Sequence, residues 1–465
     1  MKKLLAILLT LCMVFPWIPA VARAEEVPGE AQTDRIIVPV PEEETDDVIP
    51  ETQFVTDTLP FRINPVYEGL ITEADLDIPE LPEIDPEQVF THAETYLSLE
   101  EAAAQVRQQM KNRAESFTIH VKYSNGKAQE AGDAVVAEAL EHTGVSTEGD
   151  YLMWQFAGWQ AAYDRNYNSD EQVFEFTFDF IMVYYTTAAQ EKEMDTAVTN
   201  LINSLGVKNK SDYEKIKGVY DWICDNVTYD YANLEDTSYM LKHTAYAALI
   251  NKTAVCQGYA VLFYRLMLEL GVDNRVIAGL AASGEAHGWN IVKLEGDYYH
   301  VDVTWGDNSN TDLSKGSEGF GYEYFCITDA DIQMSRTTDS DPPVPNCTAV
   351  SCNYFVRSGL YFEVYDHRAV CSRMAELLAD PSRRRLDIRF ASAPVLEAAK
   401  RQLAYNGGIF EVLRSVGREP QFSFGSNDKF HIFSIFLPEG KQPEPPKQEP
   451  PQDEDPSIPS IDEPD

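Results

Sequence analysis

The sequence predicts an α+β fold in which one apolar helix packs against antiparallel strands. The helix follows Cys256, has almost no polar face and ends at Gly271, a residue type that adopts positive φ readily. After Gly271 the apolar residues recur with a period of two, which indicates strands. Helical and strand-like patterns also occur before and after this stretch, so flanking α+β modules are expected.

The strands after the helix are expected to form a hairpin of residues 287–295 and 298–305, with Gly296-Asp297 at its tight turn. Side chains on the second strand alternate between two faces. The core face carries Tyr299, Val301, Val303 and Trp305, and the opposite face carries His300, Asp302 and Thr304. A two-residue turn places His287 on the same face as Asp302. In this register His287 lies opposite Gly306, about 13 Å along the strand from Asp302 at ~3.3 Å per residue. A bulge, a longer turn or slanted barrel strands would have to close that gap.

A cysteine, a histidine and an aspartate in this order are typical of a thiol nucleophile, its base and the group that orients the base. Cys256 stands at a helix start, where the helix dipole lowers a thiol pKa below its usual ~8.5. Unpaired backbone N–H groups at that end can also hold an oxyanion. His287 is the expected base and Asp302 its orienting residue, while His300 is an alternative base on the Asp302 face.

The three residues lie in the segments VCQGYA, HGWN and VDVTW. These segments resemble the transglutaminase-like superfamily, whose fold is papain-like. The resemblance covers residues 212–307 well, extends toward Tyr354, and implies that Cys256, His287 and Asp302 are the catalytic residues. Because the family includes protein cross-linking enzymes, amidases, peptidases and catalytically inactive members, it indicates the chemistry better than the substrate.

Several further residues are weaker candidates for the same site. The resemblance implies that His243 and Tyr246, which precede the nucleophile helix, line the cleft. It also implies a side-chain donor for the oxyanion, for which Gln257 is the candidate. Gly258 lets a substrate backbone come close. Trp289 is either a core residue or a platform for substrate, and the core position is favoured.

Composition narrows the possible partners. The formal net charge is −39, and acidic residues are concentrated toward both ends, which argues against nucleic acid or anionic lipid as a partner. Of the seven cysteines, Cys12 lies in the first apolar stretch, and six are too few for a disulfide scaffold in a chain of this length. A pair between Cys347 and Cys352 is left open. Since no two cysteines have a zinc-type spacing, no metal is expected. No cofactor is expected either.

The chain is expected to divide into six segments. They are a signal peptide at 1–24, an acidic Pro-rich and largely disordered linker at 25–96, an α+β subdomain at 97–208, the catalytic domain at 209–345, an α/β module at 346–437 and a Pro-rich acidic disordered tail at 438–465. The C-terminal module should contain strands at 354–364, 386–390 and 430–436 and helices at 369–378 and 393–405. Cleavage after Ala24 predicts a secreted protein with no membrane span, and association with the cell surface is left open.

Together these features predict a secreted cysteine acyl-transfer enzyme that acts on peptide or carboxamide bonds through a thioester and needs no cofactor. Its expected partner is a protein or peptide substrate. Hydrolysis is favoured over transfer to lysine, because the sequence shows no dedicated lysine-binding groove. Two alternatives stay open: a protein-glutamine transglutaminase, and a non-catalytic extracellular module that binds peptide or cell wall.

Overall fold

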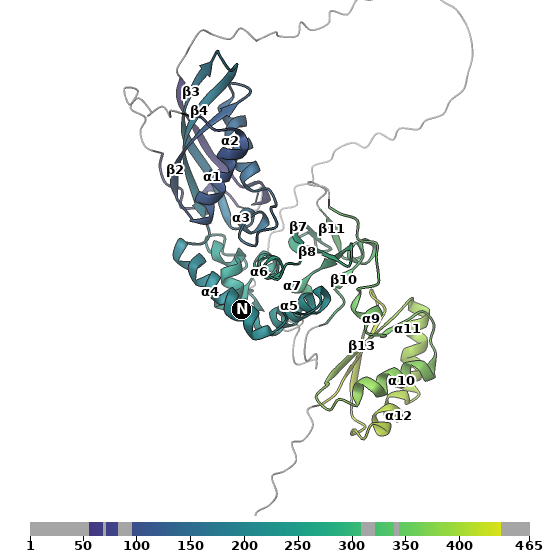
Figure 1. Ribbon diagram of the computed structural model, residues 1–465. Helices are drawn as coiled ribbons and strands as arrows, with labels where there is room; N and C mark the ends of the chain where they lie inside the picture. The colour runs from purple at the N-terminus through teal and green to yellow at the C-terminus, as the bar shows by residue number, and fades with distance from the viewer. Residues whose placement is uncertain (1–54, 68–70, 82–94, 308–320, 339–343, 439–465) are drawn as a thin grey trace, which may run out of the picture. The chain divides into compact units, whose positions relative to one another are not determined.

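The computed structural model describes residues 55–67, 71–81, 95–307, 321–338 and 344–438 (Figure 1). The expected signal peptide, the acidic residues up to 54 and the acidic tail from 439 lie outside the described residues. The described part contains helices together with two four-stranded sheets, one five-stranded sheet and one two-stranded sheet. None of its helices has the length and apolar character needed to cross a membrane.

The first sheet is antiparallel and has the strand order β1-β3-β4-β2. Its strands are β1 (Val55–Ile63), β2 (Ser116–Tyr123), β3 (Phe156–Asn168) and β4 (Val173–Tyr184), and its helices are α1 (Leu99–Lys111), α2 (Ala128–Ala139) and the short α3 (Asp150–Met153). Helices α1 and α2 pack on one face of the sheet (Figure 1). Helix α1 begins with the capping box that the sequence indicates, because the Ser98 side chain accepts from the Glu101 N–H.

The prediction of a largely disordered linker over residues 25–96 is wrong for its described part. Strand β1 pairs with β3, and short 3-10 helices follow at Pro65–Tyr67 and Glu73–Asp75. The average composition is acidic, but Leu59 and Phe61 point into the core and Tyr67 is fully buried. A few well-spaced apolar residues therefore suffice where a neighbouring strand offers its backbone groups.

The central part surrounds one buried helix, α6 (Cys256–Glu269). Helix α6 packs against helix α5 and against strands β7 and β8 (Figure 1). Gly271 follows the end of α6 with φ +76°, as predicted. The other helices are α4 (Ala188–Leu205), α5 (Asp212–Asn226), α7 (Val303–Gly306) and α8 (Asp329–Ile332), with a 3-10 turn at Met240–His243 and a π turn at Ala247–Asn251. The strands are β5 (Thr228–Tyr229), β6 (Thr253–Ala254), β7 (Asn274–Ala281), β8 (Ala286–Leu294), β9 (Asp297–Val301), β10 (Phe325–Ile327) and β11 (Arg336–Thr338), with the five-stranded order β10-β9-β8-β7-β11.

The hairpin of β8 and β9 turns one residue earlier than predicted. Leu294 pairs with Asp297, and the turn residues Glu295 and Gly296 both have positive φ, at 55° and 96°. A two-residue turn of this type needs two positive φ values, and the glycine serves as its second residue. The register moves by two residues, so His287 falls two rather than four residues from Asp302. The gap of about 13 Å shrinks to ~6.6 Å at ~3.3 Å per residue, without a bulge.

Strand β9 ends at Val301, not at residue 305. The Asp302 side chain accepts the Trp305 N–H and caps the helical turn α7. Helical geometry takes Trp305 out of the predicted core face, and its side chain is 45% exposed. The alternation rule fails here because the capping aspartate ends the strand.

The C-terminal module has strands β12 (Tyr361–Phe362), β13 (Arg385–Phe390), β14 (Ser423–Asn427) and β15 (Ile432–Phe436) with helices α9 (Tyr354–Arg357), α10 (His367–Leu378), α11 (Ala393–Lys400) and α12 (Gly408–Ser415). The strand predicted at 354–364 is wrong, since Asn353 caps helix α9 there and only two residues join the sheet. Helix α12 and strand β14 were not predicted. All six cysteines of the described residues are free, Cys347 and Cys352 included.

Candidate active site

Cys256 is the first residue of α6, where backbone N–H groups lack helical partners. The strand β6 leads into it, and the Val255 N–H donates to the Lys242 carbonyl, which fixes the entry of the chain. The Cys256 N–H lies in hydrogen-bond contact with the Tyr229 hydroxyl. The thiol is therefore held at a rigid helix start, and it is buried.

The structure brings the three predicted residues together. His287 Nε2 lies 2.8 Å from Asp302 Oδ2, and both side chains are buried. The imidazole also forms a hydrogen bond with the Cys256 thiol, for which Nδ1 is the nitrogen left free by Asp302. Asp302 Oδ1 accepts the Trp305 N–H at 3.1 Å, so both carboxylate oxygens are occupied.

The electrostatics of these residues favour a charged thiol–imidazole pair. Burial raises the pKa of the Cys256 thiol, but the hydrogen bond and charge of His287 and the Gly288 N–H outweigh it, and the net pKa is lowered. Burial lowers the pKa of His287, but Asp302 and the thiol outweigh this effect and raise it to about 9. Asp302 itself stays ionised, because His287 and Arg336 overcome its burial and hold its pKa well below its ordinary value.

A cavity of about 220 Å³ opens beside this group. Its described lining residues come from the nucleophile helix, from strands β7 and β8, from the loops before α6, and from the segments that follow β1 and precede β3. They are Val66, Tyr67, Ile71, Trp154, Tyr229, Leu234, Thr237, Lys242, His243, Val255, Cys256, Gln257, Ala278, Gly279, Ala286, His287 and Gly288. The lining is mostly apolar, and the thiol and the imidazole both face a space large enough for part of a substrate.

Comparison with known proteins finds a family model that covers the region of Cys256, His287 and Asp302. The model of the transglutaminase-like superfamily matches residues 199–303, which run from within α4 to the first residue of α7. Residues 199–303 form a transglutaminase-like domain. Two curated relatives are the kyphoscoliosis peptidases of Homo sapiens and Mus musculus, each 29% identical, over 140 and 150 residues. These alignments cover 28% and 30% of this chain and 20% and 22% of the relatives, so the chain spans about a fifth of their length.

Two solved structures are also similar. One is a TGase, at 17% identity over 44% of this chain and 58% of that one, with a TM-score of 0.25. The other comes from Cytophaga hutchinsonii and is described as a candidate cysteine protease, at 12% identity over 41% of this chain and 65% of that one, with a TM-score of 0.19.

Of the weaker candidate residues, some line the cavity and others do not. Gln257 lines the cavity and bonds to the His243 side chain. Tyr246 does not line the cavity, because its hydroxyl donates to Glu193 at the surface. Trp289 is buried and stacks on the His287 ring with centroids 5.8 Å apart, so it supports the imidazole as a core residue.

Gly258 has a packing role that the sequence did not indicate. A Cβ at this position would lie 2.6 Å from Ala254 Cβ and 2.9 Å from the Thr244 carbonyl oxygen. Gly258 is absent from the described cavity lining, where Gly288 is present instead. The missing side chain therefore lets the preceding segment approach α6, rather than a substrate.

Exchanging these two glycines for alanine separates the roles. Gly258→Ala should lower the free energy of unfolding by about 1–3 kcal/mol, because backbone atoms must move. Gly288→Ala should change it by less than about 0.5 kcal/mol, since its nearest contact would be Gln257 Cγ at 3.7 Å. Urea unfolding of both variants measures the difference. Equal stabilities would contradict the packing role of Gly258.

The alternative base, His300, is engaged elsewhere. Its Nδ1 accepts the Trp289 indole N–H at 3.0 Å, and its Nε2 lies 2.9 Å from Asp329 Oδ1. Because an indole N–H can only donate, Nδ1 is unprotonated and Nε2 carries the hydrogen that Asp329 accepts. Neither nitrogen contacts Cys256, and the ring instead anchors Trp289, the residue stacked on His287.

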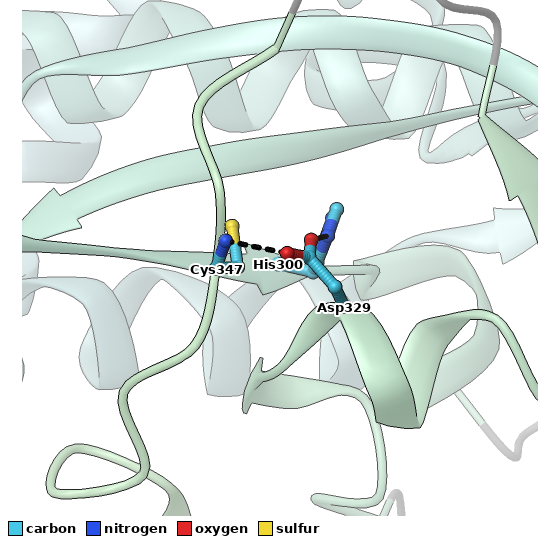
Figure 2. A group of neighbouring side chains, drawn as sticks. All are labelled: His300, Asp329 and Cys347. Atoms are coloured by element: carbon cyan, nitrogen blue, oxygen red, sulfur yellow. Dashed lines mark hydrogen bonds and ion pairs between the residues drawn. The ribbon is translucent and has the colours of Figure 1, made fainter.

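His300, Asp329 and Cys347 also form a group of metal-ligand types, with ligand atoms within 4.8 Å of one another (Figure 2). Asp329 Oδ2 accepts the Cys347 N–H at 2.8 Å, and burial together with Asp329 raises the pKa of the Cys347 thiol to about 12. Because Nδ1 accepts from Trp289, a metal at Nε2 would require the imidazolate anion, in which neither nitrogen carries a proton. The contacts of this group therefore fit a hydrogen-bonded relay better than an ion site.

Three features of the site were missed by sequence reasoning. Tyr67 and Ile71 reach the cavity from a segment interpreted as an acidic linker, and their apolar type in that composition was the available signal. Tyr229 touches the Cys256 N–H, although the sequence analysis gave it no role in the site. Arg336 bonds to Asp302 from 34 residues away, and no pattern around it could have indicated this contact.

Proposed function

We propose that the chain is a cysteine acyl-transfer enzyme that hydrolyses peptide or carboxamide bonds through a thioester. The observation that carries this proposal is the hydrogen-bonded series Cys256–His287–Asp302 at the wall of a cavity. The similarity to the kyphoscoliosis peptidases supports peptide bonds as the substrate class. The signal-peptide pattern at the start of the sequence supports an extracellular site of action.

Each residue has a defined part in the proposed reaction. The Cys256 thiolate attacks the carbonyl carbon, and the Tyr229 hydroxyl, whose oxygen accepts the Cys256 N–H, donates its O–H to the resulting oxyanion. As the C–N bond breaks, the His287 imidazolium gives its proton to the leaving amine. Water then attacks the thioester and neutral His287 takes one of its protons. The C–S bond breaks, the carboxylic acid leaves, and the thiolate–imidazolium pair is restored.

The lining of the cavity supports water rather than lysine as the acceptor. None of the described lining residues is acidic, so nothing among them attracts a lysine ammonium. The one cation of the lining, Lys242, donates to the backbone carbonyls of Asn233, Leu234 and Asp236. His243 stays neutral, because burial and Lys242 lower its pKa to about 4. The cavity thus suits an uncharged or apolar part of a peptide.

Incubation with a peptide library in H₂¹⁸O, together with a fluorescent alkyl amine, tests the choice of acceptor. We expect new carboxyl ends that carry ¹⁸O and little amine incorporation, both analysed by mass spectrometry. Cys256→Ala is the control and should abolish all product. Amine incorporation in excess of hydrolysis would instead identify a cross-linking enzyme, and the absence of both from the wild-type chain would favour a binding module.

The raised pKa of His287 predicts the alkaline side of the pH profile. The imidazolium donates to the leaving amine, so hydrolysis should fall as the pH rises through about 9. Alkylation of Cys256 needs only the thiolate and should not fall there. Measuring both rates from pH 7 to 11 checks the assignment, which a parallel fall of the two rates would contradict.

A further inference from the structure

A buried arginine shares the carboxylate of the triad. Arg336 begins strand β11, the edge strand that pairs with β7. Its Nη2 lies 2.7 Å from Asp302 Oδ2, and neither side chain is exposed to solvent. The same oxygen, Oδ2, is the partner of His287 Nε2. One carboxylate oxygen of Asp302 therefore contacts both the imidazole of His287 and the guanidinium of Arg336.

The guanidinium of Arg336 contacts two aromatic rings and bonds through both of its terminal nitrogens. Its carbon lies 4.2 Å from the centre of the Trp305 ring and 5.1 Å from that of Tyr324. Nη1 donates to the Ser335 carbonyl at 3.0 Å. Among the described residues, Asp302 is the one acidic group within ion-pair distance of Arg336. The cation thus has a single counterion and a preset position beneath the exposed Trp305.

The charges of the site balance only when Arg336 is included. The active form carries a thiolate, an imidazolium and a carboxylate, which together leave one negative charge in a buried place. The other titratable groups facing Asp302 are Tyr220 on α5, Tyr324 before β10 and His300 on β9. Burial raises the pKa of the two tyrosines and lowers the pKa of His300, so all three are neutral near pH 7. Arg336 supplies the missing positive charge.

We propose that Arg336 is a positioning residue, which holds Asp302 toward His287 and cancels the negative charge that the carboxylate would otherwise place near the Cys256 thiolate. This inference rests on the proposed thiol chemistry. Arg336 touches neither the substrate nor the reacting atoms and acts through Asp302. The surface residue Trp305 covers the guanidinium and shields the Arg336–Asp302 ion pair from solvent.

The proposal predicts a defined change in the pH profile. Without the guanidinium, a proton binds more readily to both Cys256 and His287, so the pKa of each should rise. The acid midpoint of Cys256 alkylation should therefore move upward by about one pH unit, the lower end of the shifts that a neighbouring charge causes. Lysine at position 336 keeps the charge and should restore most of the midpoint.

The test uses the full chain and iodoacetamide as the probe, over pH 4 to 9. Arg336→Met is compared with Arg336→Lys and with Arg113→Met, which breaks a different buried ion pair, between Arg113 and Glu191 of α4. We expect the midpoint to shift in Arg336→Met only. Circular dichroism verifies folding, and if Arg336→Met does not fold, Arg336→Gln gives the same comparison with an uncharged donor.

The outcomes separate this inference from the proposed function. An unchanged midpoint in folded Arg336→Met or Arg336→Gln, or an equal shift in Arg113→Met, would overturn the role of Arg336 while the triad stands. A wild-type thiol that reacts only near pH 8.5 would overturn the thiol chemistry, and the role of Arg336 with it.

Discussion

Replacing His287 by glutamine will remove the reactivity of Cys256 at low pH. The imidazole forms a hydrogen bond with the thiol and, as an imidazolium, lowers the pKa of Cys256 against the effect of burial. A thiol with an ordinary pKa of ~8.5 is only about one part in 10³ thiolate at pH 5.5. The rate of alkylation by iodoacetamide at that pH should therefore fall, by up to roughly 10³-fold.

His300→Gln is the matched control, because His300 is the other histidine of the hairpin and was the alternative base. Its nitrogens contact Trp289 and Asp329. We expect its alkylation rate at pH 5.5 to stay within a few-fold of the wild-type rate. If the loss occurred in His300→Gln and not in His287→Gln, the base would have to be reassigned.

Replacing Asp302 by asparagine should reduce both activity and stability. Asparagine still caps α7 but cannot compensate the His287 imidazolium, and a change of this kind lowers turnover by about 10⁴-fold in a related type of triad. It also leaves Arg336 buried without a counterion. Removing one partner of such a pair destabilises a fold by about 3–5 kcal/mol. Peptide hydrolysis and urea unfolding measure the two effects.

A second substitution distinguishes the two effects. Asp302→Asn combined with Arg336→Met removes both charges, and we expect it to recover much of the lost stability and none of the activity. A double-mutant cycle in urea gives the coupling between the two side chains. If the double variant were as unstable as the sum of the single ones, the charge pair would not account for the loss.

The sequence was sufficient to predict which residues come together in the candidate site. The apolar run after Cys256 predicts a buried helix, because a helix without a polar face has to lie inside the protein, and α6 does so. The period of two after Gly271 predicts strands and puts His287 and Asp302 on one face. The motifs around these residues indicated the superfamily that the comparison supports.

Local sequence patterns were insufficient where a turn or a helix cap decided the position of a side chain. The distance between His287 and Asp302 depended on whether the hairpin turned at Glu295-Gly296 or at Gly296-Asp297. Both are plausible in sequence, and they differ by two residues in register. The position of Trp305 depended on the capping of α7 by Asp302, which overrides the alternation of a strand.

The sequence by itself determined the nucleophile helix, the order of the Cys, His and Asp residues and the hairpin that brings His287 and Asp302 together, because these follow from periodicity and spacing within one stretch. Only the tertiary structure decided which groups meet there from elsewhere. Tyr67 joins the cavity from the acidic segment, and Arg336 reaches Asp302 from an edge strand. Such contacts join residues far apart in the chain, and no local periodicity records which distant side chain a fold will bring to a buried charge.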